Sequence, residues 1–217
     1  MGTVISVNAG EAQTIIVNQK EHRTGIFKYS VKTPLHIKTT GVQKDTVVDT
    51  RVHGGVDKAV YLYPSEHYAY WKNIYPNLDW QWGMFGENLT TKGLIEKDVH
   101  IGSIYQFGET VLQVSQPRQP CYKLGYRFNN MEVVKQFKQS PLPGIYFRVL
   151  EEGYIKAGDS IKLLESKDNH VTLVDVSGLL AKTNKDSELL DRAINDKLLA
   201  KSAVNDLIKL RDRNKIN

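Results

Sequence analysis

Short runs of β-branched and aromatic residues, separated by glycine and polar turns, fill the chain up to about residue 165 and constrain its fold more than any other feature. The runs are TVISVN, QTIIVN, TVVDTRV, AVYLY, DVHIGSIYQFG, TVLQVSQ, GIYFRVL and DSIKLLE. Many short strands at close spacing are typical of β-barrels and β-sandwiches, whereas a doubly wound sheet needs a helix after each strand. The pattern predicts a mainly β fold, a β-barrel with a few short helices, as a domain over residues 1–165.

One helix is expected inside this region, in the segment SEHYAYWKNIYP. Ser65 is a capping residue type, Glu66 suits the positive end of a helix dipole, and Pro76 ends the helix.

After about residue 165 the alternation stops, and residues 166–217 are expected to form a segment of three short helices. The expected starts are the capping residue types Thr172, Asp186 and Ser202. Such a short segment folds poorly alone, so it should dock on the barrel or on a partner.

The charge and composition limit the function classes. The 29 basic and 24 acidic residues give a formal charge of +5, and no block of five like charges occurs, which argues against nucleic-acid binding. A small anionic ligand held by a few arginines and lysines fits this charge better. There is no apolar run of membrane-spanning length, no secretory signal pattern, and only one cysteine. We therefore expect a cytoplasmic protein that binds neither nucleic acid nor membrane.

The single cysteine lies in QPRQPCYKLG, residues 116–125. A structural cysteine usually packs among aliphatic residues, but the nearest aliphatic run ends at Val114, seven residues before Cys121. Pro117 and Pro120 stiffen the loop, and Arg118 favours the thiolate, which is the form that acts as nucleophile or metal ligand. The pattern predicts a functional rather than a structural Cys121.

A second informative stretch is DTRVHGGVDKAVYLYP. Four residues recur at every fourth position, a spacing that would form a metal site on a helix: Asp45, Asp49, His53 and Asp57. The β-branched residues and the Gly54–Gly55 pair favour a strand instead, on which Asp49 and His53 would still share a face. His53 is also the distant partner that a cysteine–histidine dyad would need.

The paired glycines indicate either a tight turn with positive φ or close approach of the backbone to a ligand. The charged residues around them are Arg51, His53, Asp57 and Lys58. Such a cluster is typical of an anion or cofactor cradle, and equally of a solvated hairpin.

The loop GMFGENL adds a second glycine-bracketed segment, with Glu87 and Asn88. No phosphate-binding P-loop or dinucleotide fingerprint is present, so the chain is not expected to carry its own nicotinamide or flavin domain.

Four motifs together resemble the MOSC-domain family, in the order that family has them: VHGGVDKAVYLYP, GMFGENLTTKGL, QVSQPRQPCYKLG and GIYFRVLEEGYIKAGD. KTPLH, residues 32–36, is similar to an early lysine-containing segment of the family. The match covers essentially the whole chain and is closest to the stand-alone bacterial, YiiM-like branch with a three-helix C-terminal tail.

The resemblance implies a molybdenum cofactor, a pterin whose dithiolene chelates molybdenum and which ends in a phosphate. The family's cysteine, implicated as a metal or sulfur ligand, matches Cys121, and a soft thiolate suits molybdenum. The residues expected to bind the cofactor are Lys32, Arg51, His53, Gly54, Gly55, Glu87, Asn88, Arg118 and Arg148. Those expected to be catalytic are Cys121, His53 and Asp57. Arg148 could equally pair with an acidic neighbour.

Two functions follow from the resemblance. The first is a molybdenum-dependent reductase of N-hydroxylated small molecules such as hydroxylaminopurines, served by a separate electron-donor protein. The second is a sulfur carrier or cofactor-handling protein that bears a persulfide on Cys121. A non-catalytic ligand-binding barrel with an inert cysteine is the third reading.

Overall fold

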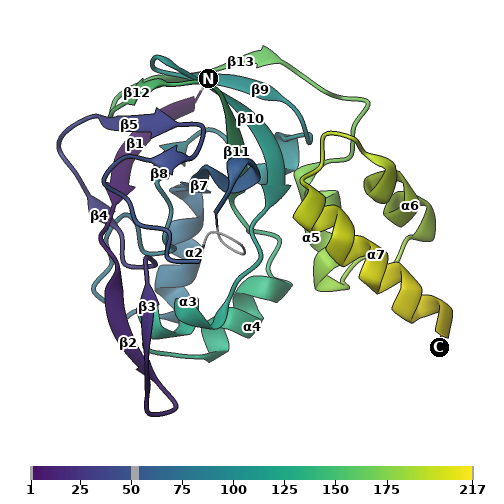
Figure 1. Ribbon diagram of the computed structural model, residues 1–217, viewed down its shortest axis with the longest axis horizontal. Coiled ribbons are helices and arrows are strands. Elements are labelled where there is room, and N and C mark those ends of the chain that lie inside the picture. Colours follow the sequence, from purple (N-terminus) through teal and green to yellow (C-terminus); the bar gives the residue numbers. More distant parts are fainter. Residues whose placement is uncertain (1, 50–53, 217) are drawn as a thin grey trace.

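The computed structural model describes residues 2–49 and 54–216, which form a closed β-barrel with helices around it (Figure 1). Seven strands make the barrel: β1 (Gly2–Ala9), β8 (Leu89–Lys92), β7 (Val60–Pro64), β11 (Ile145–Glu151), β10 (Thr110–Pro117), β9 (Ile104–Phe107) and β13 (Ser160–Glu165). The first strand closes on the last, with Gly2 opposite Ile161 and Thr3 opposite Ser160. Neighbouring strands are antiparallel except for β7 and β8. The predicted mainly β fold is confirmed.

Smaller strands extend this framework. β4 (Tyr29–Ser30) pairs with the end of β1, and β5 (Leu35–Lys38) pairs with both β6 (Gly41–Val42) and β12 (Gly153–Ile155). β2 (Gln13–Val17) and β3 (Lys20–Thr24) form a hairpin that extends away from the barrel (Figure 1).

The TVVDTRV run was expected to be a strand, and that prediction is wrong for residues 46–49, which are irregular. Polar bonds replace a strand ladder there, because the backbone N–H of Thr46 donates to Gly10 O at 3.0 Å and the Asp45 carboxylate accepts from Gly10 N at 3.1 Å. Residues 50–52 of the run lie outside the described residues.

In the part of the chain that the structure describes, short helical segments lie between the strands: η1 (Val56–Lys58), α2 (Glu66–Ile74), η2 (Glu96–Asp98), α3 (Tyr122–Arg127) and α4 (Glu132–Gln139). α2 is the helix predicted from the sequence. Ser65 precedes it, but its backbone is already helical (φ −63°, ψ −25°), whereas a capping side chain needs an extended backbone. The Ser65 hydroxyl donates to Glu66 Oε2 at 3.3 Å instead.

Two hydrophobic clusters fill the molecule. The barrel interior is lined by aliphatic and aromatic strand residues such as Leu62, Leu112 and Phe147. A second, mainly aromatic cluster, which includes Trp71 and Phe85, packs the short helices against the barrel wall. Rings that pack edge to face or offset add specific geometry to the area they bury, so this cluster makes a rigid support for the loops beside it.

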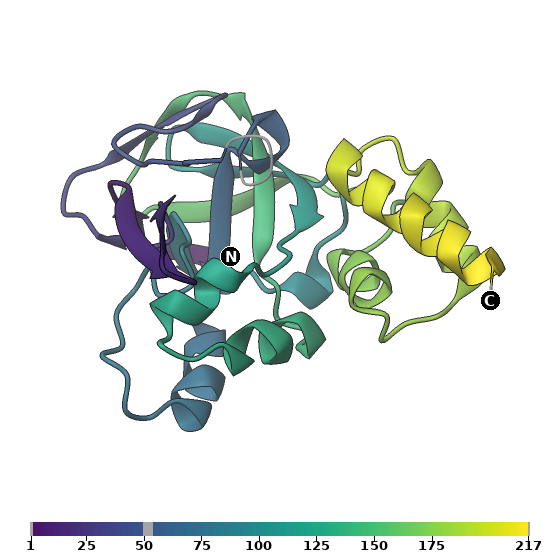
Figure 2. The same cartoon turned by 60° about the horizontal axis from the view of Figure 1, so that its bottom comes forward.

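The tail consists of α5 (Leu173–Ala181), α6 (Ser187–Asn195) and α7 (Lys201–Ile216), which lie to one side of the barrel (Figure 2). Thr172 caps α5 in a capping box with Asp175, and Asp186 caps α6, as predicted. The expected start at Ser202 is wrong, because α7 begins at Lys201 and the Ser202 hydroxyl donates to Gln116 Oε1 at 2.7 Å.

Buried tail residues belong to the same core cluster as the barrel residues, so the tail packs on its own barrel. The division into domains at residue 165 stays a prediction. Within the described part of the chain, no helix is long and apolar enough to cross a membrane.

Candidate functional site

A cavity of about 660 Å³, counting its open mouth, lies where the end of the β3 strand, the loop 45–49, the start of β7 and the cysteine loop with the start of α3 meet. Its described lining combines apolar surface with a few charged groups, among which are four cationic side chains and two carboxylates. The cations are Lys28, Lys58, Arg118 and Lys123, and the carboxylates are Asp45 and Asp49.

Cys121 lines this cavity as a half-buried free thiol. It occupies the residue before α3 and has an extended backbone (φ −123°, ψ 167°). Pro117 ends β10, and Pro120 immediately precedes the cysteine, so the loop between them has little conformational freedom. The structure thus places the thiol on the wall of a cavity rather than in a core.

Arg118 is the buried cation of the same loop, and it also lines the cavity. Its guanidinium donates to the carbonyl oxygen of Phe85 and stacks on the rings of Tyr61 and Phe137, with its central carbon 4.7 and 5.5 Å from their centres. Burial lowers the pKa of Arg118, but the charges of Tyr61, Tyr146 and Cys121 outweigh burial and raise it overall. The cavity therefore keeps one permanent positive charge close to Cys121.

Lys28 is a second buried cation, and the sequence predictions missed it as a site residue. It forms an ion pair with Asp45, whose side chain is also buried. Asp45 is held in turn by Asn88 Nδ2 at 3.0 Å and by the backbone of Gly10 at 3.1 Å. Burial lowers the pKa of Lys28, and the carboxylate of Asp45 partly opposes this. A lysine inside the apolar stretch GIFKYSV was the available signal, because lysine is rarely buried unless it is paired.

Lys58 and Lys123 also line the cavity, and neither was among the expected cofactor-binding residues. Burial lowers the pKa of Lys58, while the charges of Asp206 and Asp57 oppose that effect. Lys58 had been noted only as part of the charge cluster around the paired glycines.

Of the predicted residues in the GMFGENL loop, Asn88 lies at the cavity and Glu87 does not. Asn88 accepts from the backbone N–H of Tyr61 at 3.2 Å while it donates to Asp45. Glu87 is fully buried and accepts four hydrogen bonds, from Tyr68, Gly83, Phe85 and Thr90. Burial raises the pKa of Glu87, and these donors oppose the rise. Its contacts show a structural role in shaping the loop, and its cofactor role stays a prediction.

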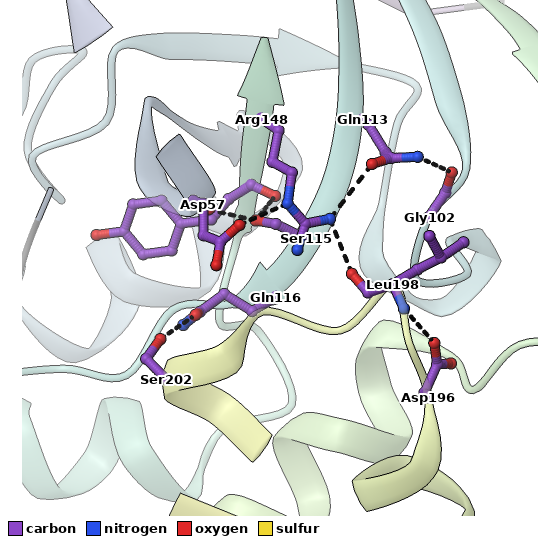
Figure 3. A network of polar contacts seen from close by, with 10 residues as sticks. Asp57, Gly102, Gln113, Ser115, Gln116, Arg148, Asp196, Leu198 and Ser202 are labelled. Carbon is purple, nitrogen blue, oxygen red and sulfur yellow. Dashed lines mark hydrogen bonds and ion pairs between the residues drawn. The ribbon is translucent and has the colours of Figure 1, made fainter. Parts of the chain in front are cut away.

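Asp57 and Arg148 pair with each other instead of facing the cavity (Figure 3). Arg148 Nε lies 2.5 Å from Asp57 Oδ1, and Nη1 donates to the carbonyl oxygen of Leu198 at 2.8 Å. The acidic neighbour anticipated for Arg148 is therefore Asp57, and the pair connects η1 to the tail.

The remaining predicted residues are dispersed. Lys32 is exposed in the loop between β4 and β5, and neither it nor the two glycines line the cavity. Gly55 has φ +86° before η1, and a Cβ there would meet no atom within 4 Å, so turn geometry rather than close approach requires the glycine. Arg51 and His53 lie outside the described residues. Within residues 2–49 and 54–216, no three His, Cys, Asp or Glu side chains group as a metal site.

Fold and site together define a small closed β-barrel protein that presents one thiol and several cations to a cavity. The model of the MOSC domain family matches residues 49–162, and the chain belongs to this family as a YiiM-like member. It is 36% identical to the uncharacterized protein YflK of Bacillus subtilis over 97% of this chain and 95% of that protein. It is 33% identical to the protein YiiM of Escherichia coli over 89% of this chain and 87% of that protein.

Two further comparisons extend this result. The crystal structure of YiiM from Geobacillus stearothermophilus has a TM-score of 0.81 at 31% identity, covering 97% of this chain and 99% of that one. A protein of Gibberella moniliformis named Reductase is 33% identical over 87% of this chain but only 34% of its own length.

Proposed function

We propose that this protein binds a molybdenum cofactor in the cavity and reduces N-hydroxylated small molecules, such as hydroxylaminopurines, with Cys121 as the molybdenum ligand. One observation carries the proposal: the chain's single thiol lies on the wall of a cavity that several cationic side chains also line.

The residues present fit this cofactor. A thiolate is the soft ligand that a metal chelated by sulfur accepts. The terminal phosphate needs cationic partners, and Arg118, Lys58 and Lys123 line the same cavity. The charge of Lys28 is neutralised by Asp45. Lys28 is therefore better suited to donate a hydrogen bond to a bound molecule than to attract a distant anion. Asp57 and Arg148 pair with each other, and the proposal gives them no contact with the cofactor.

The comparisons support a redox role. The MOSC family is associated with the molybdenum cofactor, and the similar fungal protein is named a reductase. About two thirds of the fungal protein lies outside the match, and this chain has no nicotinamide or flavin fingerprint. We therefore propose that a separate electron-donor protein supplies the electrons.

The reaction converts R–NHOH, two electrons and two protons into R–NH₂ and water, so the N–O bond breaks and an N–H bond forms. When bound, the cofactor supplies a centre that exchanges two electrons and an oxygen atom with the substrate. The chain's own contribution is binding, orientation and proton supply. Lys28 Nζ is the proton source we propose, because it lines the cavity, Asp45 fixes its position, and burial lowers its pKa, which makes its ammonium group a stronger acid.

Molybdenum and pterin analysis tests the proposal directly. The full-length protein is expressed in a host with active cofactor synthesis, next to a known molybdoenzyme that shows loading is efficient. We expect near-stoichiometric molybdenum and an oxidised pterin with its characteristic fluorescence. We also expect the protein to reduce hydroxylaminopurines when a chemical reductant supplies the electrons. A protein that holds neither while the control is loaded contradicts the proposal. One added sulfur atom on Cys121, detected by mass spectrometry, would then favour the sulfur-carrier function.

A further inference from the structure

The C-terminal tail follows the segment that leads to Cys121. Three hydrogen bonds of 3.0, 2.7 and 3.2 Å join Ser115 to Ala200, Gln116 to Ser202 and Gln119 to Asp206, respectively. The contacts advance along both segments in the same order. Residues 200–206 therefore run beside the end of β10 and the first part of the cysteine loop.

The same part of the tail also holds the segment that carries Lys58. Arg148 bridges the carbonyl oxygen of Leu198 and the carboxylate of Asp57, and the Ser115 hydroxyl donates to the carbonyl oxygen of Asp57 at 2.5 Å (Figure 3). Asp57 directly precedes Lys58, which lines the cavity. Two wall segments far apart in sequence are thus fixed to one stretch of tail.

Asp206 acts on both segments. One of its oxygens accepts from Gln119, two residues before Cys121, and its charge opposes the effect of burial on the pKa of Lys58. Its other oxygen lies 3.4 Å from Lys209 Nζ on the exposed face of α7.

We propose that residues 198–206 are a strap that positions the Cys121 loop relative to the Lys58 turn, with Asp206 and Ser202 as positioning residues. The strap sets how open the cavity is at the thiol and how much positive charge faces it. This inference goes beyond the proposed function and does not rest on it, because it concerns access to the thiol in the protein without any cofactor.

The experiment uses the full chain prepared without cofactor, in which thiol modification reports on Cys121 alone because it is the single cysteine. Rates are measured with neutral iodoacetamide and with the dianion dithiobis(nitrobenzoate). The variants are Ser202→Ala, Asp206→Asn and Gln119→Ala. The matched control is Asp191→Asn, an exposed aspartate of α6 that pairs with Arg211 at 3.6 Å and does not line the cavity.

We expect Ser202→Ala and Gln119→Ala to raise both rates by a similar factor of about two to five, the range that a partly exposed polar contact can give. Asp206→Asn should raise the rate with the dianion more than the rate with iodoacetamide, because Lys58 then loses one of the carboxylates whose charges oppose its own. The excess should shrink in about 0.5 M salt, which screens exposed charges.

Rates in Asp206→Asn and Ser202→Ala that equal those of Asp191→Asn would overturn the proposal. Equal acceleration with both reagents in Asp206→Asn, together with a lower melting temperature, would show a purely stabilising aspartate and would overturn its positioning role. Gln119→Ala removes the same hydrogen bond without altering α7, so the proposal stays testable if the tail variants unfold.

Discussion

The guanidinium carbon of Arg118 lies 4.7 Å from the centre of the Tyr61 ring, so the cation beside Cys121 is stacked as well as hydrogen-bonded to Phe85 O. A planar group is needed for both contacts at once, and a lysine ammonium cannot reproduce them. The position of the charge at the cavity therefore depends on an arginine.

Replacing Arg118 by lysine should lower the free energy of unfolding by about 1–2 kcal/mol, because the stacking and the buried hydrogen bond to Phe85 O are lost together. Urea denaturation measures this as a lower midpoint with an unchanged m-value. Exposed Lys135→Arg on α4 is the control for a change of cation type alone. Equal stability of Arg118→Lys and the native protein would contradict the stacking argument.

Replacing Cys121 by serine should abolish molybdenum retention while the protein stays folded, because a hydroxyl is a poor ligand for a soft metal and the side chain is half-buried. Metal analysis and circular dichroism measure the two effects on the same sample. Tyr122→Phe, a change next to it in the sequence, should retain the metal. Full molybdenum content in Cys121→Ser would remove the thiol from the proposed ligand set.

Lys28 should make stability depend on alkaline pH. Burial holds its pKa in the folded chain below the usual 10.5. Between that lowered value and 10.5 the unfolded chain binds more protons than the folded chain, so the free energy of unfolding rises with pH across this window. The Lys28→Met/Asp45→Asn double variant should lack the part of this rise that comes from Lys28, while Lys58, whose pKa burial also lowers, contributes equally in both proteins. Urea denaturation of both proteins from about pH 8 to 10.5 measures the difference. If the free energy of unfolding depends on pH in the same way in both proteins, burial does not lower the pKa of Lys28.

Two glycines with similar φ should differ in their tolerance of alanine. At Gly83, with φ +85°, a Cβ would lie 2.6 Å from the carbonyl oxygen of Lys28, whereas Gly55 at φ +86° has no atom within 4 Å. Gly55→Ala should cost about 1 kcal/mol of backbone strain, and Gly83→Ala clearly more because of the added clash. Denaturation midpoints of the two variants give the comparison. If Gly83→Ala is as stable as Gly55→Ala, the carbonyl group of Lys28 moves away from the added Cβ without loss of stability.

Replacing Glu87 by glutamine should destabilise the fold by about 1–3 kcal/mol, because one donor of the loop then faces an amide NH₂ instead of a carboxylate oxygen. Since Glu87 does not line the cavity, molybdenum content per folded molecule should stay at the native level. If Glu87→Gln loses molybdenum but keeps its stability, the result would support the predicted contact between Glu87 and the cofactor.

The β-barrel could be predicted from the sequence because its strands have strong local signals. Val60–Pro64 and Thr110–Pro117 are runs of β-branched and aromatic residues bounded by turns, and such runs specify strands without reference to distant residues. The run at residues 46–49 has the same composition, but it lacks a strand neighbour and bonds to Gly10 instead. The local sequence pattern does not show whether a neighbouring strand is available to pair with such a run.

The candidate site was only partly predictable. Cys121 and Arg118 stood out by their unusual local context, and both lie at the cavity. Lys28 reaches the same place through an ion pair with a residue seventeen positions away, which no spacing rule predicts. Arg148 was predicted to bind the cofactor because it is a cation. Its guanidinium instead pairs with Asp57 and donates to the carbonyl oxygen of Leu198 in the tail.

The closure of the barrel between its first and last strands has a consequence for how the chain folds. β1 pairs with β13, about 160 residues later, so the barrel cannot close until most of the chain has left the ribosome. Such non-local pairing slows folding, and an unfinished chain leaves β1 with an unpaired edge that is prone to aggregate. Truncated or stalled chains of this protein should therefore depend on chaperones far more than the finished molecule does.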